Sequence, residues 1–192
     1  MKDKRKSYFT TKLTTREETG GDKYIEGYFV VFNQETELWR GVYEKIDPHA
    51  LDESVRENDI RCLFNHDSGA VLGRTSAQTF RLSVDDYGVY GSVKVNDNDS
   101  MACDVYARVA RGDISGCSFG FFPDEEDYTV DENGNTHWTV LKADTHELSV
   151  CTFPAYPQTD IQARQKDFEN AVSAKREKQK IQLKERIEKI WH

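Results

Sequence analysis

The stretch ISGCSFGFF, residues 114–122, has the β-branched and aromatic content of a buried strand but contains two glycines. Successive side chains on a strand point to opposite faces, so one face is apolar and consists of Cys117, Phe119 and Phe121. The other face is nearly bare, with the Ser118 hydroxyl between Gly116 and Gly120. A bare face lets another backbone approach closely, as a serine nucleophile facing a peptide requires. A neighbouring sheet packed against small residues is the simpler interpretation of this stretch alone.

Composition around this stretch is that of a soluble protein with a substantial core. Of the 192 residues, 37% are hydrophobic and 31% are charged, and no apolar run approaches the length of a membrane span. The first residues, MKDKRKSYFTTK, lack the apolar centre of a signal peptide, so we expect a cytoplasmic protein. The four cysteines stand singly in apolar segments, which favours buried thiols over a structural zinc site.

The net charge of −8 is unevenly distributed along the chain. From Arg164 onward there are nine Lys/Arg and five Asp/Glu, whereas the rest of the chain has 17 basic and 29 acidic residues. An acidic body is a poor binder of nucleic acid. In the tail, glutamates interleaved with lysines also disfavour nucleic-acid and membrane binding. The sequence therefore predicts neither kind of partner.

Strand patterns dominate the chain between residues 23 and 161. We expect strands at residues 24–33, 42–46, 60–64, 71–75, 79–84, 89–95, 114–122, 138–141 and 147–153. Residues 34–38 are expected to form a polar loop, and the acidic residues 124–136 a hairpin arm. Because helices separate few of these strands, we predict a mainly β (α+β) body, a largely antiparallel β-barrel with peripheral helices.

Helices are expected at two places inside this body and at the C-terminal end. A short helix follows Pro48, and a longer one covers residues 99–111, with Asp99 or Ser100 as its cap and Gly112 after its end. The domain boundaries follow from these patterns. Residues 1–22 form a flexible N-terminal segment with an edge strand at residues 8–13, residues 23–161 the main domain, and residues 162–192 a C-terminal helical tail.

Residues suited to nucleophilic catalysis occur in three of these strand regions. A serine hydroxyl needs an adjacent base to remove its proton, and that base works best when a third group accepts its other N–H. Ser118 stands on the bare face, and His66 follows the strand at residues 60–64, where functional side chains often project. A surface turn is the plainer interpretation of that histidine. For the third group, alternation places Glu147 on the more polar face and His146 on the apolar one, unless a β-bulge reverses the order.

Other chemistry has less support in the sequence. The histidines at positions 66, 137 and 146 and Asp67 lack the i, i+4 helical spacing of an HExxH metal site. Cys117 lies on the apolar face, which would keep it an inert thiol. The chain also contains no glycine-rich loop of the phosphate-binding types. The sequence therefore predicts neither a metal nor a cofactor.

Five landmarks occur in a recognisable order: G-Y-F-x-x-F-N, Y-E-K-I-D-P-H-A-L, L-F-N-H-D with L-G-R soon after, G-D-I-S-G-C-S-F-G-F, and H-E-L-S-V-C-T-F-P-A-Y-P. They run from about Gly27 to Pro157, and their combination resembles the prohead proteases of tailed bacteriophages, which are related to the herpesvirus assemblins. His49 departs from the phage pattern, which more often has glycine after the proline. We expect this difference to affect a loop and not the chemistry.

The resemblance implies a serine endopeptidase with a small, herpesvirus-protease-like β-barrel surrounded by helices. Such an enzyme acts in the host cytoplasm, inside the assembling prohead, where it cleaves the scaffold or the scaffolding segment of the major capsid protein, and commonly itself. By motif position, the resemblance implies Ser118 as nucleophile, His66 as general base and Glu147 as the orienting acid. His146 stays an alternative because the herpesvirus relatives have a second histidine there, and Asp67 is a weaker candidate.

The resemblance also bears on substrate contacts and partners. Contacts with the substrate and the oxyanion are expected around Gly116, Phe119 and Gly120, with backbone amides of residues 118–120 or 155–156 as donors. The herpesvirus relatives are compatible with a homo-oligomer. The C-terminal tail lies outside the resemblance and is expected to target the capsid, bind the scaffold or be removed by self-cleavage.

Two other functions remain open at this point. A non-catalytic scaffold or capsid-assembly chaperone that retains the protease fold would explain the long polar tail, which a protease does not need. A hydrolase unrelated to phage, using the same three residues, would act on small esters and not on capsid protein.

Overall fold

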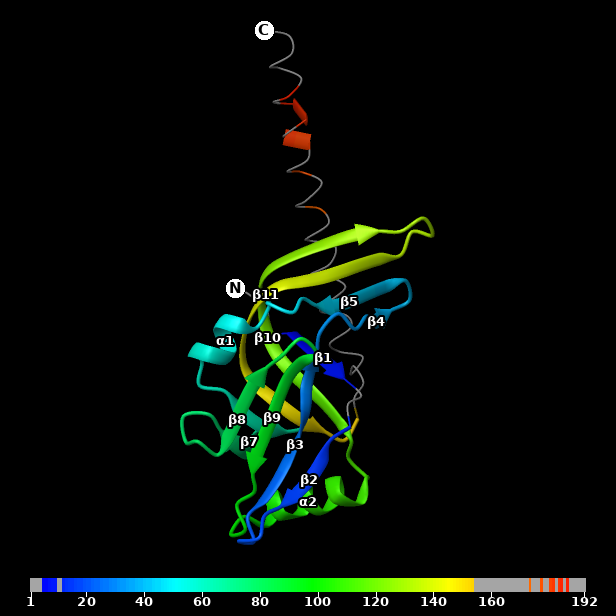
Figure 1. Ribbon diagram of the computed structural model, residues 1–192. Helices are drawn as coiled ribbons and strands as arrows, with labels where there is room; N and C mark the ends of the chain where they lie inside the picture. Colours follow the sequence, from blue (N-terminus) through cyan, green and yellow to red (C-terminus); the bar gives the residue numbers. More distant parts are fainter. Residues whose placement is uncertain are drawn as a thin grey trace. The chain divides into compact units, whose positions relative to one another are not determined.

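A hairpin of two long strands, β10 (Gly116–Val130) and β11 (Thr136–Cys151), is the axis of the fold in the computed structural model (Figure 1). The structure describes residues 5–9 and 12–153, together with isolated positions between 173 and 186. Apart from those positions, the predicted helical tail at residues 162–192 lies outside the described residues. The hairpin confirms the acidic arm expected from the sequence and extends it into the body of the protein.

The hairpin belongs to a seven-stranded sheet in which β11 is central. The strand order is β1-β10-β11-β5-β4, while β6 pairs with both β11 and β7. The remaining strands of this sheet are β1 (Arg5–Phe9), β4 (Thr36–Trp39), β5 (Val42–Ile46), β6 (Arg61–Phe64) and β7 (Asp67–Arg74). One edge of β11 pairs with β10, and the other edge pairs in succession with β5 and β6, both of them parallel to it.

Side-chain and backbone groups cover β11 where it passes from β5 to β6. Helix α1 (Asp52–Glu57) lies between these two strands in sequence, so a stretch of β11 has no strand neighbour on the edge opposite β10. There the Ala143 N–H donates to the Ala50 carbonyl over 2.9 Å, and the Asn58 side-chain amide donates to the Thr145 carbonyl over 2.8 Å. Because both bonds replace missing ladder bonds, β11 continues unbroken toward the region of Ser118.

The second sheet has four strands in the order β2-β3-β9-β8. These strands are β2 (Thr14–Glu17), β3 (Lys23–Val31), β8 (Phe80–Val84) and β9 (Gly88–Lys94). Helix α2 (Ser100–Arg111) then leads from β9 toward β10. The Asp99 carboxylate accepts from the Met101 and Ala102 amides, and Gly112 ends the helix in a left-handed conformation, so the predicted caps are confirmed.

The core draws its largest side chains from both sheets. Phe29 and Phe80 of the four-stranded sheet and Phe119 and Phe121 of β10 are all fully buried. The rings of Phe119 and Phe121 are stacked, with centroids 4.7 Å apart. A Cβ at Gly91 would lie 2.7 Å from the Phe29 ring and 2.8 Å from the Phe80 ring, so only glycine allows them to approach the strand. The apolar face predicted for β10 is therefore the core face.

The mainly β character predicted from the sequence is confirmed, but two features differ. The described strands form two sheets and no closed barrel, so the predicted barrel is corrected to a two-sheet arrangement. Strand β4 occupies residues that were expected to form a polar loop, because it pairs with β5 at the edge of the sheet. Residues 1–22 include two paired strands, β1 and β2, and the flexibility of this segment stays a prediction. No helix in the described part of the chain is long and apolar enough to cross a membrane.

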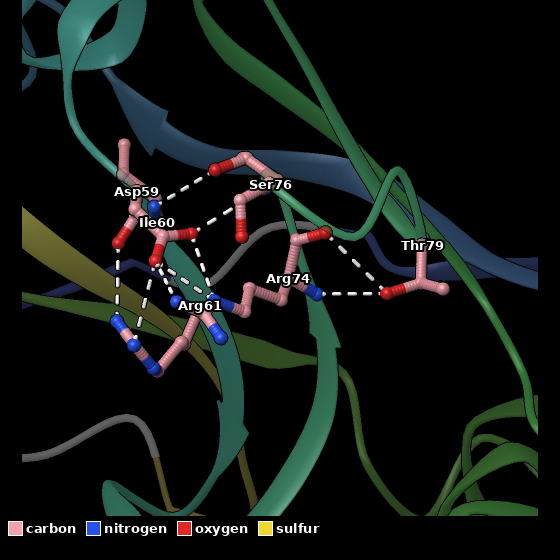
Figure 2. Close-up of polar contacts among 7 residues, drawn as sticks. Asp59, Ile60, Arg61, Arg74, Ser76 and Thr79 are labelled. Atoms are coloured by element: carbon pink, nitrogen blue, oxygen red, sulfur yellow. Dashed lines mark hydrogen bonds and ion pairs between the residues drawn. The ribbon is translucent and has the colours of Figure 1, made fainter.

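A cluster of charged side chains fastens the start of β6 to the end of β7 (Figure 2). The Arg74 guanidinium donates from Nε to both carboxylate oxygens of Asp59, at 3.0 and 2.8 Å, and Arg61 lies 3.4 Å from the same carboxylate. Ser76 adds a backbone N–H at 3.3 Å, and the Thr75 hydroxyl accepts from the Ile60 N–H at 2.9 Å. Together these bonds hold the open end of the β6–β7 hairpin, whose turn carries His66.

Acid is expected to weaken this cluster. The hydrogen bonds from Arg74 hold the pKa of Asp59 well below its usual range, so the carboxylate stabilises the fold above its unfolded pKa of about 3.9. That contribution is lost as pH falls through the lower, folded pKa. Thermal unfolding of wild type and Asp59→Asn, measured from pH 6 to pH 2, should give melting temperatures that converge toward the acid end. The exposed Asp86→Asn serves as control, and a difference independent of pH would contradict the expectation.

Candidate active site

The β6–β7 turn and strands β10 and β11 bring His66, Ser118 and Glu147 into one hydrogen-bonded chain. His66 Nε2 lies 2.8 Å from Ser118 Oγ, and His66 Nδ1 lies 3.1 Å from each carboxylate oxygen of Glu147. All three side chains are nearly inaccessible, since Ser118 is 0% exposed and the side chains of His66 and Glu147 are 8% and 4% exposed. With a hydroxyl on one ring nitrogen and a carboxylate on the other, the imidazole is placed to take a proton from Ser118.

The backbone of the β6–β7 turn sets the position of His66. The two turn residues, Asn65 and His66, both have positive φ angles, of 52° and 60°. Such a two-residue turn suits the twist of a hairpin, but it is costly for a histidine, since residues other than glycine seldom adopt this conformation. Asn65 holds the turn against the end of β11: its N–H donates to the Val150 carbonyl and its side-chain oxygen accepts from the Thr152 N–H, both at 2.9 Å.

The strand that carries Ser118 is buried on both faces. Gly116 and Gly120 flank Ser118 at alternate positions and are buried with it, as expected for the bare face. Phe119 was grouped with the substrate contacts, but its side chain lies in the core against Phe121. Only the backbone of Phe119 therefore lies beside Ser118.

A β-bulge at His146 decides which residue of β11 faces His66. Gly120 pairs with Glu147 but Phe121 pairs with Thr145, so His146 is the extra residue between them. The His146 ring is exposed and lies 3.1 Å from the Asp144 carboxylate. Buried Thr145 donates its hydroxyl to the Gly120 carbonyl at 2.8 Å. The bulge thus leaves Glu147 at the site and turns His146 toward solvent.

Ser149, which the sequence analysis did not select, completes the buried cluster. It is 0% exposed, donates its hydroxyl to Glu147 Oε2 over 3.0 Å, and lies 3.3 Å from His66 Nδ1. Ser149 pairs with Ser118 across the β10–β11 ladder, so both hydroxyls stand on the same face. Strand alternation places Ser149 on the same face as Glu147, so this pattern could have marked Ser149 as a neighbour of the site.

The other candidates from the sequence lie in different surroundings. Asp67 is exposed, and its carboxylate accepts from the Gly69 N–H at 2.8 Å. His137 lies on the hairpin arm between Glu35 and Asp131, and the hydrogen bond to Glu35 raises its pKa. Among the residues that the structure describes, no three His, Cys, Asp or Glu side chains are grouped as metal ligands.

The buried thiols of the core are poor competitors for the role of nucleophile. Cys62, Cys117 and Cys151 are buried cysteines of the core. Burial raises the pKa of the Cys62 thiol well above its usual value, so this group stays protonated at neutral pH. Ser118, whose hydroxyl lies 2.8 Å from His66 Nε2, is therefore a better candidate nucleophile than these thiols.

A protein-family match and a curated relative both point to phage prohead proteases. Residues 11–174 match the family described as the Caudovirus prohead serine protease. The prohead protease of Enterobacteria phage HK97 is 29% identical over 145 residues, which cover 75% of this chain and 61% of that protein. The chain therefore spans about three fifths of the length of this curated relative.

Among solved structures, the bacteriophage T4 capsid assembly protease is similar over 81% of this chain and 99% of its own, with 12% identity and a TM-score of 0.48. The family match covers most of the chain, including the β6–β7 turn with His66 and the strands that carry Ser118 and Glu147. The chain belongs to the Caudovirus prohead serine protease family.

Proposed function

We propose that this protein is a serine endopeptidase that cleaves the scaffold, or the scaffolding segment of the major capsid protein, and itself, during maturation of the phage prohead. The observation that carries the proposal is the chain of hydrogen bonds from Ser118 through His66 to Glu147, in a member of the prohead serine protease family. Ser118 and Glu147 come from strands β10 and β11 and His66 from the β6–β7 turn, and all three side chains are nearly inaccessible.

The geometry gives each residue a role in peptide-bond cleavage. Ser118 Oγ attacks the scissile carbonyl carbon while His66 Nε2 takes the hydroxyl proton. Glu147 accepts the Nδ1–H of His66, which fixes the tautomer and stabilises the imidazolium that forms. When the C–N bond breaks, His66 returns the proton to the leaving amine. A water molecule, activated by the same imidazole, then hydrolyses the ester on Ser118.

Backbone groups beside Ser118 are the proposed donors to the oxyanion. Gly116 and Gly120 carry no side chains that would separate a bound peptide from the backbone of β10, and the N–H groups of Phe119 and Gly120 lie next to the nucleophile in sequence. The other candidates, residues 155–156, lie outside the described residues. Backbone donors of this kind are positioned by the strand and do not depend on a side chain.

The setting of the reaction is part of the same proposal. The enzyme would act in the host cytoplasm, enclosed in the assembling prohead, with capsid or scaffold protein as its partner. A homo-oligomer and a herpesvirus-assemblin-type, barrel-like relationship stay predictions, as do the domain limits at residues 22 and 161. For the tail, capsid targeting, scaffold binding and self-cleavage all remain compatible with its basic charge.

The test is cleavage of co-expressed major capsid protein or scaffold, followed by intact-mass measurement over time. New fragments with defined ends, suppressed by a fluorophosphonate that becomes attached to Ser118, are the expected result. A non-catalytic scaffold or assembly chaperone would give normal assembly and no fragments with either substrate. Hydrolysis of small esters with capsid protein left intact would instead favour an unrelated hydrolase.

Ser149 is expected to act as a positioning residue for this reaction. Ser149→Ala removes a hydrogen bond to a buried carboxylate, a loss of about 1.5–3 kcal/mol, so kcat should fall by roughly 10- to 100-fold with little change in KM. Ser149→Thr, which keeps the hydroxyl, should restore much of kcat. Ser92→Ala removes a comparable bond to Glu26 in the other sheet and serves as control. Equal rates for Ser149→Ala and Ser92→Ala would exclude the role.

A further inference from the structure

The N-terminal strand β1 lies along β10 at the position of Ser118. The two strands are antiparallel, and Tyr8 is directly opposite Ser118 in their register, with Lys6 opposite Gly120 and Phe9 opposite Cys117. In such a ladder, alternate residues direct their N–H and C=O groups to one neighbour and the rest to the other. Strand β1 therefore occupies the backbone groups of β10 that face away from β11 (Figure 1).

Burial of the site indicates that this arrangement is closed to substrate. Ser118 is 0% exposed, whereas attack on a peptide requires its Oγ to come within about 3–3.5 Å of the scissile carbon. A group around Ser118 must therefore move before a substrate can bind, and the two strands that pair with β10 at this position are β1 and β11. Movement of strand β11 would break the 3.1 Å hydrogen bond between Glu147 and His66. Strand β1 carries none of the three residues.

Two further observations single out β1 as the element that moves. It is five residues long and lies at the edge of its sheet, so its release breaks pairing on one side only. The family match begins at residue 11, after β1 has ended. The family match therefore includes β10 and β11 but does not extend to β1.

We propose that the edge of β10 from Cys117 to Phe121 is the docking site for an extended segment of the substrate, and that β1 occupies this edge until the substrate replaces it. The inference rests on the proposed function. The ligand class is an extended polypeptide that pairs antiparallel to β10, as in recognition by strand addition. Main-chain hydrogen bonds then supply affinity, and the substrate backbone lies beside the Ser118 hydroxyl.

Competition between β1 and substrate would make cleavage depend on local substrate concentration. A segment tethered by a short linker competes with an effective concentration on the order of millimolar. Free substrate at micromolar concentration would leave β1 in place, whereas substrate crowded to millimolar levels would displace it. The enzyme would then remain closed in dilute solution and open where its substrate is packed densely around it.

A reversible cross-link tests the proposal directly. Residues directly opposite in an antiparallel pair have Cα atoms about 4.5–5.5 Å apart, within the range of about 4.4–6.8 Å for a disulfide. Phe9→Cys therefore places a thiol opposite Cys117. Oxidation with diamide, verified by peptide mapping of the link between position 9 and Cys117, should reduce cleavage of capsid protein at least 100-fold, and reductant should restore it. Wild type treated with diamide is the control.

A binding measurement separates this inference from the proposed function. Ser7→Pro removes one backbone donor of β1 and should release the strand. A labelled peptide of residues 4–10, KRKSYFT, should then bind Ser7→Pro but not the cross-linked protein, as measured by fluorescence anisotropy. This result is independent of catalysis, so it supports the docking edge even if no form of the protein cleaves capsid protein. Equal binding to both forms, or full cleavage by a protein shown to be cross-linked, would overturn the proposal.

Discussion

Replacing Ser118 by alanine is expected to lower the rate of capsid-protein cleavage by a factor on the order of 10⁴–10⁶, which is the typical cost of removing a serine nucleophile. The hydroxyl is the only group lost. The flanking residues, Gly116 and Gly120, have no side chains that would repack around alanine. The variant should therefore fold normally, with a melting temperature close to that of wild type. Intact-mass measurement of capsid protein incubated with each variant gives the rate, and calorimetry gives the stability.

Two variants of the same region make this result specific. Ser115→Ala alters an exposed serine just before β10 and should cleave at the wild-type rate. Ser118→Cys places a thiol beside His66 and should make any remaining activity sensitive to iodoacetamide. If Ser118→Ala cleaved as fast as Ser115→Ala, Ser118 would not be the nucleophile, and the assembly-chaperone alternative would gain support.

Replacing Glu147 by glutamine is expected to lower kcat by about 10²–10⁴-fold, because an amide in place of the carboxylate favours the wrong tautomer of the histidine. Both carboxylate oxygens of Glu147 lie 3.1 Å from His66 Nδ1. In Glu147→Gln the amide N–H can donate to Nδ1, which moves the imidazole proton to Nε2, where it blocks acceptance from Ser118. Single-turnover rates measured at saturating substrate report this step directly.

His146→Ala is the matched variant, since it removes the neighbouring residue of the same strand. The His146 ring lies beside Asp144 at the surface, so the rate should stay within about twofold of wild type. The opposite pattern, with His146→Ala inactive and Glu147→Gln active, would assign the third position to His146 and require the bulge to rearrange in the working enzyme.

Alternation along single strands was enough to predict much of the site's geometry. It separated the core face of β10 from the face of Ser118, and it placed Glu147 rather than His146 on the polar side of its strand. Ser149 was also within reach of this reasoning, since it shares the face of Glu147 and pairs with Ser118. The roles of these residues in catalysis stay predictions.

Features that depend on distant pairing could not be predicted from local patterns. The parallel pairing of β5 and β6 with one edge of β11 joins segments far apart in the sequence, and strand β4 exists because β5 provides a partner. The bulge at His146 arises from the register of two long strands and has no local signal. The positive φ angles of Asn65 and His66 likewise follow from docking of the turn on β11 and not from the residue types alone.

The placement of the site on β10, β11 and the β6–β7 turn also has a consequence for refolding kinetics. His66 and Glu147 are 81 residues apart, and they meet when β6 pairs in parallel with β11. Pairing across such a separation is slow, because the entropy of closing the loop is lost before the contacts form. The β10–β11 hairpin closes a much shorter loop and can form earlier. Recovery of the active site, rather than of strand content, therefore marks the moment at which the chain has completed its fold.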